Sequence, residues 1–281
     1  MTRIVDSKLI KDAVKDLFIK ANTSLRPDIL AGLKLARKNE PNAKAGYVLD
    51  VIIKNAAIAK KKMLPICQDT GMAVVYLKIG QSLIVKGDIK KAVNEGVAKA
   101  YKEGYFRKSI ISGPLTTRKN TNTNLPSIIY TDIVPGNKIN IRVAAKGFGC
   151  ENASKIKMFM PTAPVSNVEK FIVDSVREAG SKPCPPIYIG IGIGGTLDKA
   201  VSLSKEAIFR PLGKSNKDKS IARLEKSILK KVNNLKIGPI GVTGKVTALG
   251  VSVLTYPTHI AGLPVALNIS CHATRTAEAT I

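Results

Sequence analysis

The chain has 281 residues, of which 44% are hydrophobic, so it is long enough to bury a substantial core as one large domain or two small ones. No apolar run approaches the roughly 18 residues of a membrane span, and the N-terminus lacks the apolar core of a signal peptide. Only four cysteines occur, unlike the dense framework of a small secreted domain. We therefore expect a cytoplasmic protein with no membrane partner.

The formal net charge of +25 raises the question of nucleic-acid binding. The lysines are spread over several predicted helices, aromatic residues make up only 5% of the chain, and no zinc-finger, basic-zipper or RNP motif occurs. A lysine-coated surface that meets an acidic partner, or that suits a hot or highly charged cell interior, is the simpler interpretation. The presence of only two glutamines, Gln68 and Gln81, agrees with heat adaptation. We expect no nucleic-acid partner.

The N-terminal part, from Val5 to Met63, has the apolar spacing of helices. Three helical segments are predicted there, and Pro27 suits the first position of the second one. Met72 to Ile79 is an almost uninterrupted apolar run that predicts a buried strand. A further helix follows, for which Asp88 is a suitable N-cap residue.

From residue 112 onward, loops, strands and helices alternate. Residues 112–126 are rich in Thr, Asn and Pro, which satisfy the backbone locally and indicate a long loop of the kind that is often functional. The later segments predict three strands, a helix, a strand–turn–helix unit, another helix and closing strands; they are 127–134, 138–147, 155–160, 168–179, 187–212, 218–235 and 244–276. We predict one α+β domain over residues 1–281, with a mixed sheet flanked by helices and a helical N-terminal subdomain at about residues 1–63.

Three glycines, Gly190, Gly192 and Gly195, satisfy the G-x-G-x-x-G pattern of dinucleotide-binding folds after a predicted strand. That pattern also requires an acidic residue at the end of a second strand about 20 residues on, where this sequence has a lysine-rich helical region. A dinucleotide site is therefore disfavoured. A glycine turn that exposes backbone N–H groups to another anion is the better interpretation.

Polar and reactive residues gather between Leu64 and Gly80, where a helix ends and a strand begins. Within this stretch, Cys67–Gly71 provides in succession a thiol, an amide, a carboxylate, a hydroxyl and a glycine that lets the backbone turn tightly. Catalytic side chains often lie on such a short loop between rigid elements. Taken alone, the stretch also fits a simple turn into a strand with one buried thiol.

Two further cysteines lie at the ends of predicted strands. Cys184 lies between prolines just before a strand, and Cys271 ends a strand just before His272. With Cys67 they can be separate core residues, or they can meet in the fold and bind a metal. Zinc, with His259 or His272 as the fourth ligand, is one possibility, although the short ligand spacings usual for zinc are missing.

Three motifs, in the same order, resemble the α subunit of the two-subunit class I fumarate hydratases and L(+)-tartrate dehydratases. They are CQDTG at Cys67–Gly71, IGIGGTLDKAVSLSKEA at Ile191–Ala207 and PTHIAGLPVALNISCHATR at Pro257–Arg275. The likeness extends from about residue 5 to the C-terminus. It implies a hydro-lyase that acts on a small dicarboxylate, with the reversible hydration of fumarate to L-malate as the first expectation and L(+)-tartrate dehydration as the alternative.

The resemblance implies a 4Fe-4S cluster held by three cysteines, with one iron position left open. The matching residues are Cys67, Cys184 and Cys271, whereas Cys150 falls where the family usually has a serine and is excluded as a ligand. An ordinary cluster uses four thiolates. Three therefore leave one iron able to act as a Lewis acid toward a hydroxyl and a carboxylate.

The resemblance also implies which residues surround the substrate: Gln68, Asp69, Arg107, the backbone near Gly149, and His259. Removing water from a 2-hydroxy diacid needs an acid near the leaving hydroxyl and a base at the neighbouring carbon. Asp69 suits the acid, because it lies two residues after a cluster ligand. Arg107 suits a substrate carboxylate through its planar guanidinium, and His259 can orient or bind the same diacid. Without the resemblance, Arg107 would be interpreted as a solvated helix end and His259 as a loop residue.

A partner chain is also expected. Single-chain members of this family continue into a C-terminal domain that supplies further arginines, a lysine and the base, whereas only ten residues follow Cys271 here. We therefore expect a β subunit to supply these groups in an α2β2 assembly. The alternative from another class is a basic nucleic-acid-binding or scaffold protein whose thiols are structural.

Overall fold

The computed structural model describes residues 2–281, which divide into two compact units. The first unit comprises the described residues up to Arg26, together with Asn55–Phe148 and Arg275–Ile281; the second comprises Pro27–Lys54 and Gly149–Thr274. Each unit has its own four-stranded sheet and its own apolar core. Among residues 2–281, none of the helices has both the length and the apolar character needed to cross a membrane.

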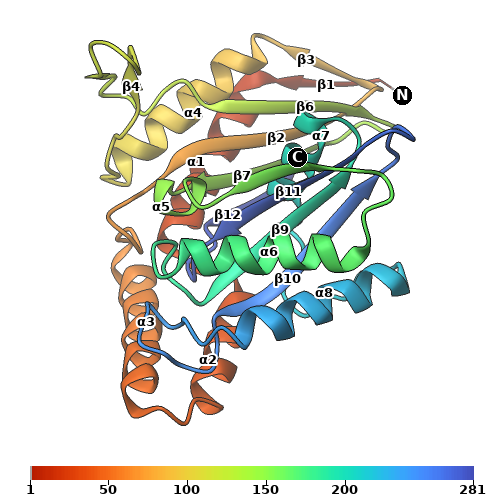
Figure 1. Ribbon diagram of the computed structural model, residues 1–281. Coiled ribbons are helices and arrows are strands. Elements are labelled where there is room, and N and C mark those ends of the chain that lie inside the picture. The colour runs from red at the N-terminus through yellow and green to blue at the C-terminus, as the bar shows by residue number, and fades with distance from the viewer. Residues whose placement is uncertain (1) are drawn as a thin grey trace. The chain divides into compact units, whose positions relative to one another are not determined.

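The first unit is built on a mixed sheet in the order β12-β7-β2-β6 (Figure 1). β2 pairs parallel with β6 and antiparallel with β7, which in turn pairs antiparallel with β12. A short parallel pair, β1 with β3, and a short antiparallel pair, β4 with β5, lie outside this sheet. The strands of the unit are β1 (Arg3–Asp6), β2 (Met72–Gly80), β3 (Leu83–Lys86), β4 (Ile111–Ser112), β5 (Lys119–Asn120), β6 (Ile128–Val134), β7 (Ile139–Lys146) and β12 (Thr276–Thr280).

Two helices, α1 (Ser7–Thr23) and α4 (Ile89–Glu103), pack against each other and bury their apolar faces against this sheet. Phe18 of α1 and Val97 of α4 are fully buried in the same core as Val75 and Ile141 of the sheet. Burying one such side chain contributes about 1.5–3 kcal/mol. The apolar periodicity of the two helices is therefore satisfied by one shared core.

The second unit has a sheet in the order β10-β9-β11-β8, in which β10 is an edge strand parallel to β9. β11 runs antiparallel to both β9 and β8. Helices α6 and α8 cover one face, since their apolar residues share a core with Ile187, Ile189 and Ile191 of β9. The elements are α2 (Pro27–Lys38), β8 (Lys155–Phe159), α6 (Val165–Ala179), β9 (Ile187–Gly194), α7 (Leu197–Ala207), α8 (Lys219–Asn233), β10 (Ala248–Tyr256) and β11 (Leu263–Ser270). Two helices run from one unit into the other, α3 (Ala43–Lys62) and α5 (Phe148–Glu151).

The glycines of the G-x-G-x-x-G pattern let α7 pack closely on β9. A Cβ at Gly190 would lie 2.2 Å from the carbonyl oxygen of Ser204, and one at Gly192 would lie 2.0 Å from that of Ala200. No side chain fits at either position, because the obstructing atoms are backbone. The backbone N–H of Gly195 donates to the carbonyl oxygen of Pro257 at 3.2 Å. These glycines therefore serve helix–strand packing and a tight turn.

The α+β fold class and the helical N-terminal portion are confirmed. Asp88 caps α4 as predicted, since its side chain accepts from the backbone N–H of Lys91 at 2.8 Å. The strand β1 was not predicted, because it is only four residues long and depends on pairing with the distant β3. β12 was also not predicted as a separate strand. The assignment of the whole chain to one domain, with a helical subdomain, stays a prediction.

Candidate functional site

The loop Cys67–Gly71 lies in the first unit, between α3 and β2. Two asparagines hold the backbone of Ile66, the residue just before this loop. The backbone N–H of Ile66 donates to the carbonyl oxygen of Asn22 at 2.8 Å. The side-chain amide of Asn55 donates to the carbonyl oxygen of Ile66 at 2.9 Å. Both groups come from helices, so the residue just before Cys67 is held by rigid elements.

A buried tyrosine and a buried asparagine hold the other end of the loop. The hydroxyl of Tyr101 lies 2.7 Å from the carbonyl oxygens of both Thr70 and Gly71. The side-chain amide of Asn124 donates to the same Gly71 oxygen at 3.2 Å. Gly71 has φ 77°, and a Cβ there would lie 2.7 Å from the carbonyl carbon of Ala145, so glycine is required. Burial raises the pKa of Tyr101, which keeps its hydroxyl protonated as a donor.

Asp69 is oriented by backbone donors on both of its carboxylate oxygens. Oδ1 accepts from the N–H of Gly71 at 3.0 Å, and Oδ2 accepts from the N–H of Phe148 at 2.8 Å. The guanidinium of Arg275, which is buried, donates to the carbonyl oxygen of Asp69 itself. Gly147 permits this arrangement, because a Cβ there would lie 2.7 Å from Nη2 of Arg275 and 3.0 Å from Oδ2 of Asp69.

The first unit brings four of the predicted site residues into one neighbourhood. Cys67 is half-buried, Gln68 is exposed, and Asp69 is half-buried. The hydroxyl of Thr70 donates to the backbone oxygen of Arg107 at 2.8 Å, which ties the Arg107 segment to the loop. The side chain of Arg107 is exposed. A thiol, an amide, a carboxylate and a guanidinium therefore lie on connected backbone.

Cys184 and Cys271 lie together in the second unit, although 86 residues separate them in the sequence. Cys184 comes just before β9 and Cys271 just after β11, and these strands are antiparallel neighbours with Ser270 opposite Tyr188. The carbonyl oxygen of Cys184 accepts from the backbone N–H of His272 at 3.4 Å and lies 3.0 Å from its ring Nδ1. Both cysteine-bearing segments are therefore joined at one end of the sheet.

The backbone at Cys184 is in the left-handed region, with φ 52°. For a residue with a Cβ this conformation is uncommon, and such outliers cluster at functional sites where the surrounding structure imposes them. Cys184 is exposed and Cys271 is half-buried. Two thiols near one sheet end, at least one of them open to solvent, suit a ligand-binding role.

Gly149 and Cys150 lie close to the backbone of the two residues that precede Cys184. A Cβ at Gly149 would lie 3.2 Å from the carbonyl oxygen of Lys182. The thiol of Cys150 is buried and its sulfur lies 3.7 Å from the carbonyl oxygen of Pro183. Cys150 is thus packed against the backbone beside Cys184, whereas Cys184 itself is exposed.

His259 lies at the opposite end of the same sheet. It follows β10, which is parallel to β9, so it lies beyond the carboxyl ends of these strands, whereas Cys184 precedes the amino end of β9. β9 has eight residues, and at about 3.3 Å per residue this separates the two ends by roughly 23 Å. The side chain is exposed, and its Nδ1 accepts from the N–H of Ala261 at 3.2 Å. In the neutral ring, Nε2 then carries the proton and can act as a donor.

The predicted cluster ligands are divided between the two units, with Cys67 in the first and Cys184 and Cys271 in the second. Among residues 2–281, no group of three or more His, Cys, Asp or Glu side chains is arranged to hold a metal ion. The three-cysteine ligand set therefore stays a prediction.

Arg275, Tyr101 and Asn124 are the residues of this neighbourhood that the sequence alone did not single out. Arg275 contacts Asp69 across 206 positions of sequence. Tyr101 lies within an ordinary amphipathic helix, and Asn124 lies in the Asn- and Thr-rich loop. The only sequence signal was indirect: Arg275 ends the same motif that contains Cys271.

Comparison with known proteins gives a consistent picture. The sequence model of a family described as fumarate hydratase (fumerase) matches residues 11–280. A protein of Methanocaldococcus jannaschii named putative L(+)-tartrate dehydratase subunit alpha is 40% identical over 275 residues, which cover 95% of this chain and 96% of that protein. The L(+)-tartrate dehydratase subunit alpha of Escherichia coli strain UTI89 is 28% identical over 269 residues, which cover 95% of this chain and 88% of the relative.

Proposed function

The chain belongs to the fumarate hydratase family of hydro-lyases, and from this premise we propose that it is the α subunit of an enzyme that reversibly hydrates fumarate to L-malate. The observation that carries the proposal is the Asp69 carboxylate, which backbone donors orient within a loop that also bears a thiol and an exposed amide. L(+)-tartrate dehydration is the second candidate, because the relatives named above are tartrate dehydratase α subunits. Family membership favours either enzyme over a basic nucleic-acid-binding or scaffold protein.

We propose that Cys67, Cys184 and Cys271 hold a 4Fe-4S cluster with one open iron position. The donor set fits such a group, because all three are thiols on segments outside the helices and strands and none is fully buried. When bound, the cluster would supply a Lewis acid that polarises a substrate hydroxyl. Cys150 is left out of the set because its thiol is buried against the carbonyl oxygen of Pro183. Reducing compartments keep cysteines as the thiols that such a cluster needs, which supports a cytoplasmic enzyme.

Asp69 is proposed as the general acid for the leaving hydroxyl. The N–H groups of Gly71 and Phe148 fix the plane of its carboxyl group, and each oxygen keeps a second lone pair with which to hold a proton. A positioned proton donor of this kind contributes typically 100- to 10,000-fold to a rate. Arg275 and Tyr101 act as positioning residues, because they hold the backbone of the loop rather than the substrate.

The exposed side chains beside Asp69 are proposed to bind the diacid. The guanidinium of Arg107 offers a planar fork of donors that matches a carboxylate in two parallel hydrogen bonds. Gln68 can donate to the second carboxylate or to the hydroxyl through its amide. The backbone N–H at Gly149 is a further donor, next in sequence to Phe148. Recognition by several donors would fix the diacid against the acid group.

His259 is proposed to contact substrate held by a second copy of the chain. Within the second unit it lies at the far end of the sheet from Cys184 and Cys271, so one unit cannot present both groups to one small diacid. A dicarboxylate of four carbons is much shorter than the roughly 23 Å length of β9. A symmetric pair of α subunits would place His259 of one copy beside the cysteines of the other.

A mixed-chain experiment tests the His259 proposal. Asp69→Asn and His259→Ala chains, each nearly inactive, are co-expressed and assembled. In a mixed pair, one site receives both substitutions and the other receives neither, so activity should return to about a quarter of the wild-type value. If His259 served the site of its own chain, every site would carry one substitution and the mixture would stay inactive.

A β subunit is proposed as the partner, because the relatives are named as α subunits. An acidic surface on that partner would complement the +25 charge of this chain, and we propose an α2β2 assembly. The partner would supply the base and further donors for the diacid, and would exclude water from the site, which strengthens each charged contact.

The substrate is tested by assaying the assembled enzyme, kept free of oxygen, with fumarate, L-malate and L(+)-tartrate side by side. If the enzyme is a fumarate hydratase, its kcat/KM for L-malate should be about ten times that for L(+)-tartrate or more. The reverse preference would establish the second candidate. Absence of turnover with all three, by protein that contains iron, would refute the proposed activity.

A further inference from the structure

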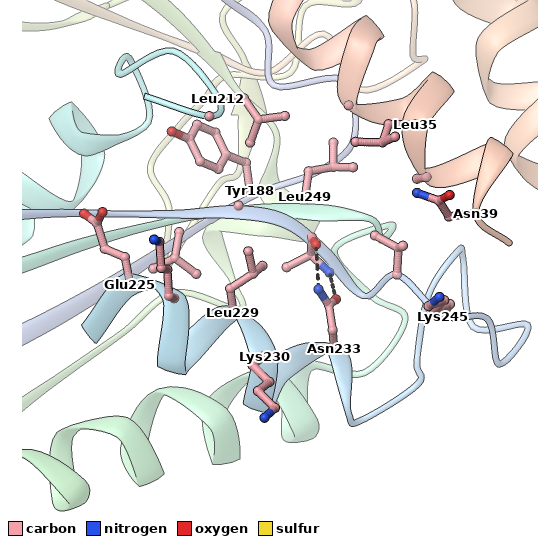
Figure 2. A pocket seen from close by; sticks show the side chains of 18 of the residues that line it. Leu35, Asn39, Tyr188, Leu212, Glu225, Leu229, Lys230, Asn233, Lys245 and Leu249 are labelled. Atoms are coloured by element: carbon pink, nitrogen blue, oxygen red, sulfur yellow. Dashed lines mark hydrogen bonds between the residues drawn. The ribbon is translucent and has the colours of Figure 1, made fainter. Parts of the chain in front are cut away.

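A cavity lies wholly within the second unit, and none of the residues assigned to the hydro-lyase site lines it. It has a volume of about 760 Å³ and runs along the outer edge of β10, with α2 on one side and α8 on the other. Figure 2 shows Tyr188, Leu212 and Leu249 on the α2 side of the strand and Leu229 on the α8 side. This volume falls within the range of small-molecule sites.

The walls of the cavity are largely apolar. Leu35 of α2, Leu212 of the loop after α7, Leu229 of α8 and Leu249 of β10 all line it, together with the ring of Tyr188. Leu35 is 60% exposed, so this part of the apolar wall is open to solvent. These side chains offer an aliphatic and aromatic surface for the body of a ligand.

The rim of the cavity is cationic. Five lysines line it, and within the described residues none of them forms an ion pair with a carboxylate; they are Lys214, Lys226, Lys230, Lys236 and Lys245. Glu225 is the one acidic residue among the described residues of the lining. Its carboxylate forms an ion pair with the guanidinium of Arg210 and accepts a hydrogen bond of 2.7 Å from the N–H of Val253. The cavity therefore has unbalanced positive charge.

Side chains fix the walls in place. The N–H of Leu212 donates to Asp28 at 2.6 Å, and the N–H of Lys245 donates to Glu40 at 2.6 Å, so two loops are tied to the α2 segment. The side-chain oxygen of Asn233 accepts from the N–H groups of residues 247 and 248 at 2.8 Å, which clamps α8 to the start of β10. The dashed lines at Asn233 in Figure 2 mark its two hydrogen bonds with residue 248. The cavity is thus largely formed before any ligand arrives, which lowers the cost of binding.

Leu212 is fitted to the cavity wall by two glycines. A Cβ at Gly32 would lie 2.5 Å from its Cδ2, and a Cβ at Gly250 would lie 2.4 Å from its Cδ1. Both obstructing atoms belong to a side chain held from its backbone by Asp28. The glycines therefore admit Leu212 between helix and strand and set the shape of the wall.

The outer edge of β10 is unsuited to pairing with an additional β-strand from a peptide. At Val253 the outward N–H donates to Glu225 and the carbonyl oxygen accepts from Asn216 at 2.9 Å. At Val251 the carbonyl oxygen accepts from Arg210 at 3.4 Å. Side chains therefore cap the edge of β10 and block the ladder that a peptide strand would need. A small molecule suits the remaining space.

We infer that this cavity binds a small organic anion with an apolar body, such as an aliphatic or aromatic carboxylate or phosphate. The leucines and Tyr188 receive the apolar body, and the lysine rim receives the anionic head group. The site is independent of the hydro-lyase chemistry, because no residue placed in that chemistry lines the cavity.

The test uses the full-length chain and the fluorescent probe 1-anilinonaphthalene-8-sulfonate, which joins an aromatic body to a sulfonate. We expect one probe per chain, displaced by decanoate or decyl phosphate below their micelle concentrations and not by decyltrimethylammonium. The more effective of the two anions identifies the preferred head group. If decyltrimethylammonium displaced the probe as effectively as the two anions do, the inference would be overturned.

Matched variants locate the site. The double change Lys226→Gln and Lys245→Gln should weaken probe binding about tenfold. The double change Lys217→Gln and Lys219→Gln, exposed residues outside the lining, removes the same charge and should alter binding less than twofold. Equal weakening by the two pairs would mean that only net charge matters, which would contradict a built site.

The apolar wall is tested in the same way. Leu35→Glu places a negative charge at the wall and should weaken probe binding at least tenfold. Leu9→Glu makes the same change at a leucine that is 51% exposed on α1 and should have no effect. Both leucines are exposed, so neither change should disturb folding, which circular dichroism verifies. Unaltered binding by the Leu35→Glu variant would overturn the inference.

Discussion

The backbone N–H of Phe148 donates a hydrogen bond of 2.8 Å to Oδ2 of Asp69, although 79 positions separate the two residues. The bond joins the loop before β2 to the segment after β7, and these strands are antiparallel neighbours. Met72 at the start of β2 lies opposite Lys146 at the end of β7, which brings both segments to one sheet end. Sheet register therefore determines where the carboxylate of Asp69 points.

Asp69→Asn tests the role of this carboxylate. An amide keeps the shape, but one of its two positions becomes an NH2 group that cannot accept from a backbone N–H and cannot transfer the proton. Turnover should fall roughly 100-fold or more while the iron content stays the same. Asp132→Asn, on the exposed part of β6, is the matched control and should be active. Unchanged turnover by fully loaded Asp69→Asn protein would remove Asp69 from the mechanism.

The proposed ligand set predicts how much iron each of four cysteine-to-serine variants retains. Ser at Cys67, Cys184 or Cys271 should abolish cluster retention, because a hydroxyl oxygen poorly replaces a soft thiolate. Ser at Cys150 should leave iron content and activity almost intact, because that thiol is packed against a carbonyl. Iron per chain, measured after anaerobic purification, checks all four. Retention of iron by Cys184→Ser together with its loss from Cys150→Ser would show that the ligand set is wrong.

Tyr101→Phe should destabilise the chain, because the carbonyl oxygens of Thr70 and Gly71 lose a buried donor. The free energy of unfolding in urea at pH 8 should fall by about 2 kcal/mol. Tyr105→Phe is the matched control, since Tyr105 is 91% exposed, and it should not change stability.

The effect of Tyr101→Phe should also depend on pH. Burial raises the pKa of Tyr101 above that of the unfolded chain, so the folded state holds this proton more tightly. The resulting stabilisation is fully present below about pH 10, the unfolded value, and is lost as the pH rises toward the raised folded value. The difference in unfolding free energy between wild type and Tyr101→Phe should therefore shrink above pH 10. A difference that grew with pH would mean that the hydroxyl is not the buried donor described here.

Gly192→Ala distinguishes a packing role from a binding role for the glycine pattern. The new Cβ would lie 2.0 Å from the carbonyl oxygen of Ala200, so α7 must move away from β9. We expect a loss of about 3 kcal/mol in unfolding free energy. Gly262→Ala is the control, because a Cβ there meets nothing nearer than 3.9 Å. Equal stability of the two variants would contradict the packing role.

The sequence predicted those features that depend on neighbours in the chain. The helices of the N-terminal portion, the N-cap at Asp88 and the buried strand at β2 all follow from local spacing and capping. The Cys67–Gly71 loop was recognisable because its reactive residues are consecutive. Local patterns were sufficient for the helices and for β2 because these elements are long and strongly periodic.

Features that depend on distant pairing could not be predicted. The contact between Arg275 and Asp69 and the pairing of β1 with β3 depend on which segments the fold brings together. Likewise, the opposite placement of His259 and Cys184 follows from β9 and β10 being parallel, which periodicity does not reveal. Short strands and single long-range hydrogen bonds leave almost no local signal.

The most direct measurement of the central claim is a titration of this chain with its β subunit. The chain is purified alone, its cluster is rebuilt without oxygen, and hydration of fumarate is followed as the candidate β subunit is added. We predict almost no activity at the start, a rise with added β subunit, and saturation at equal numbers of the two chains. Full activity before any addition would contradict the proposed split site, and no activity at saturation with either fumarate or L(+)-tartrate, despite a full complement of iron, would contradict the proposed hydro-lyase.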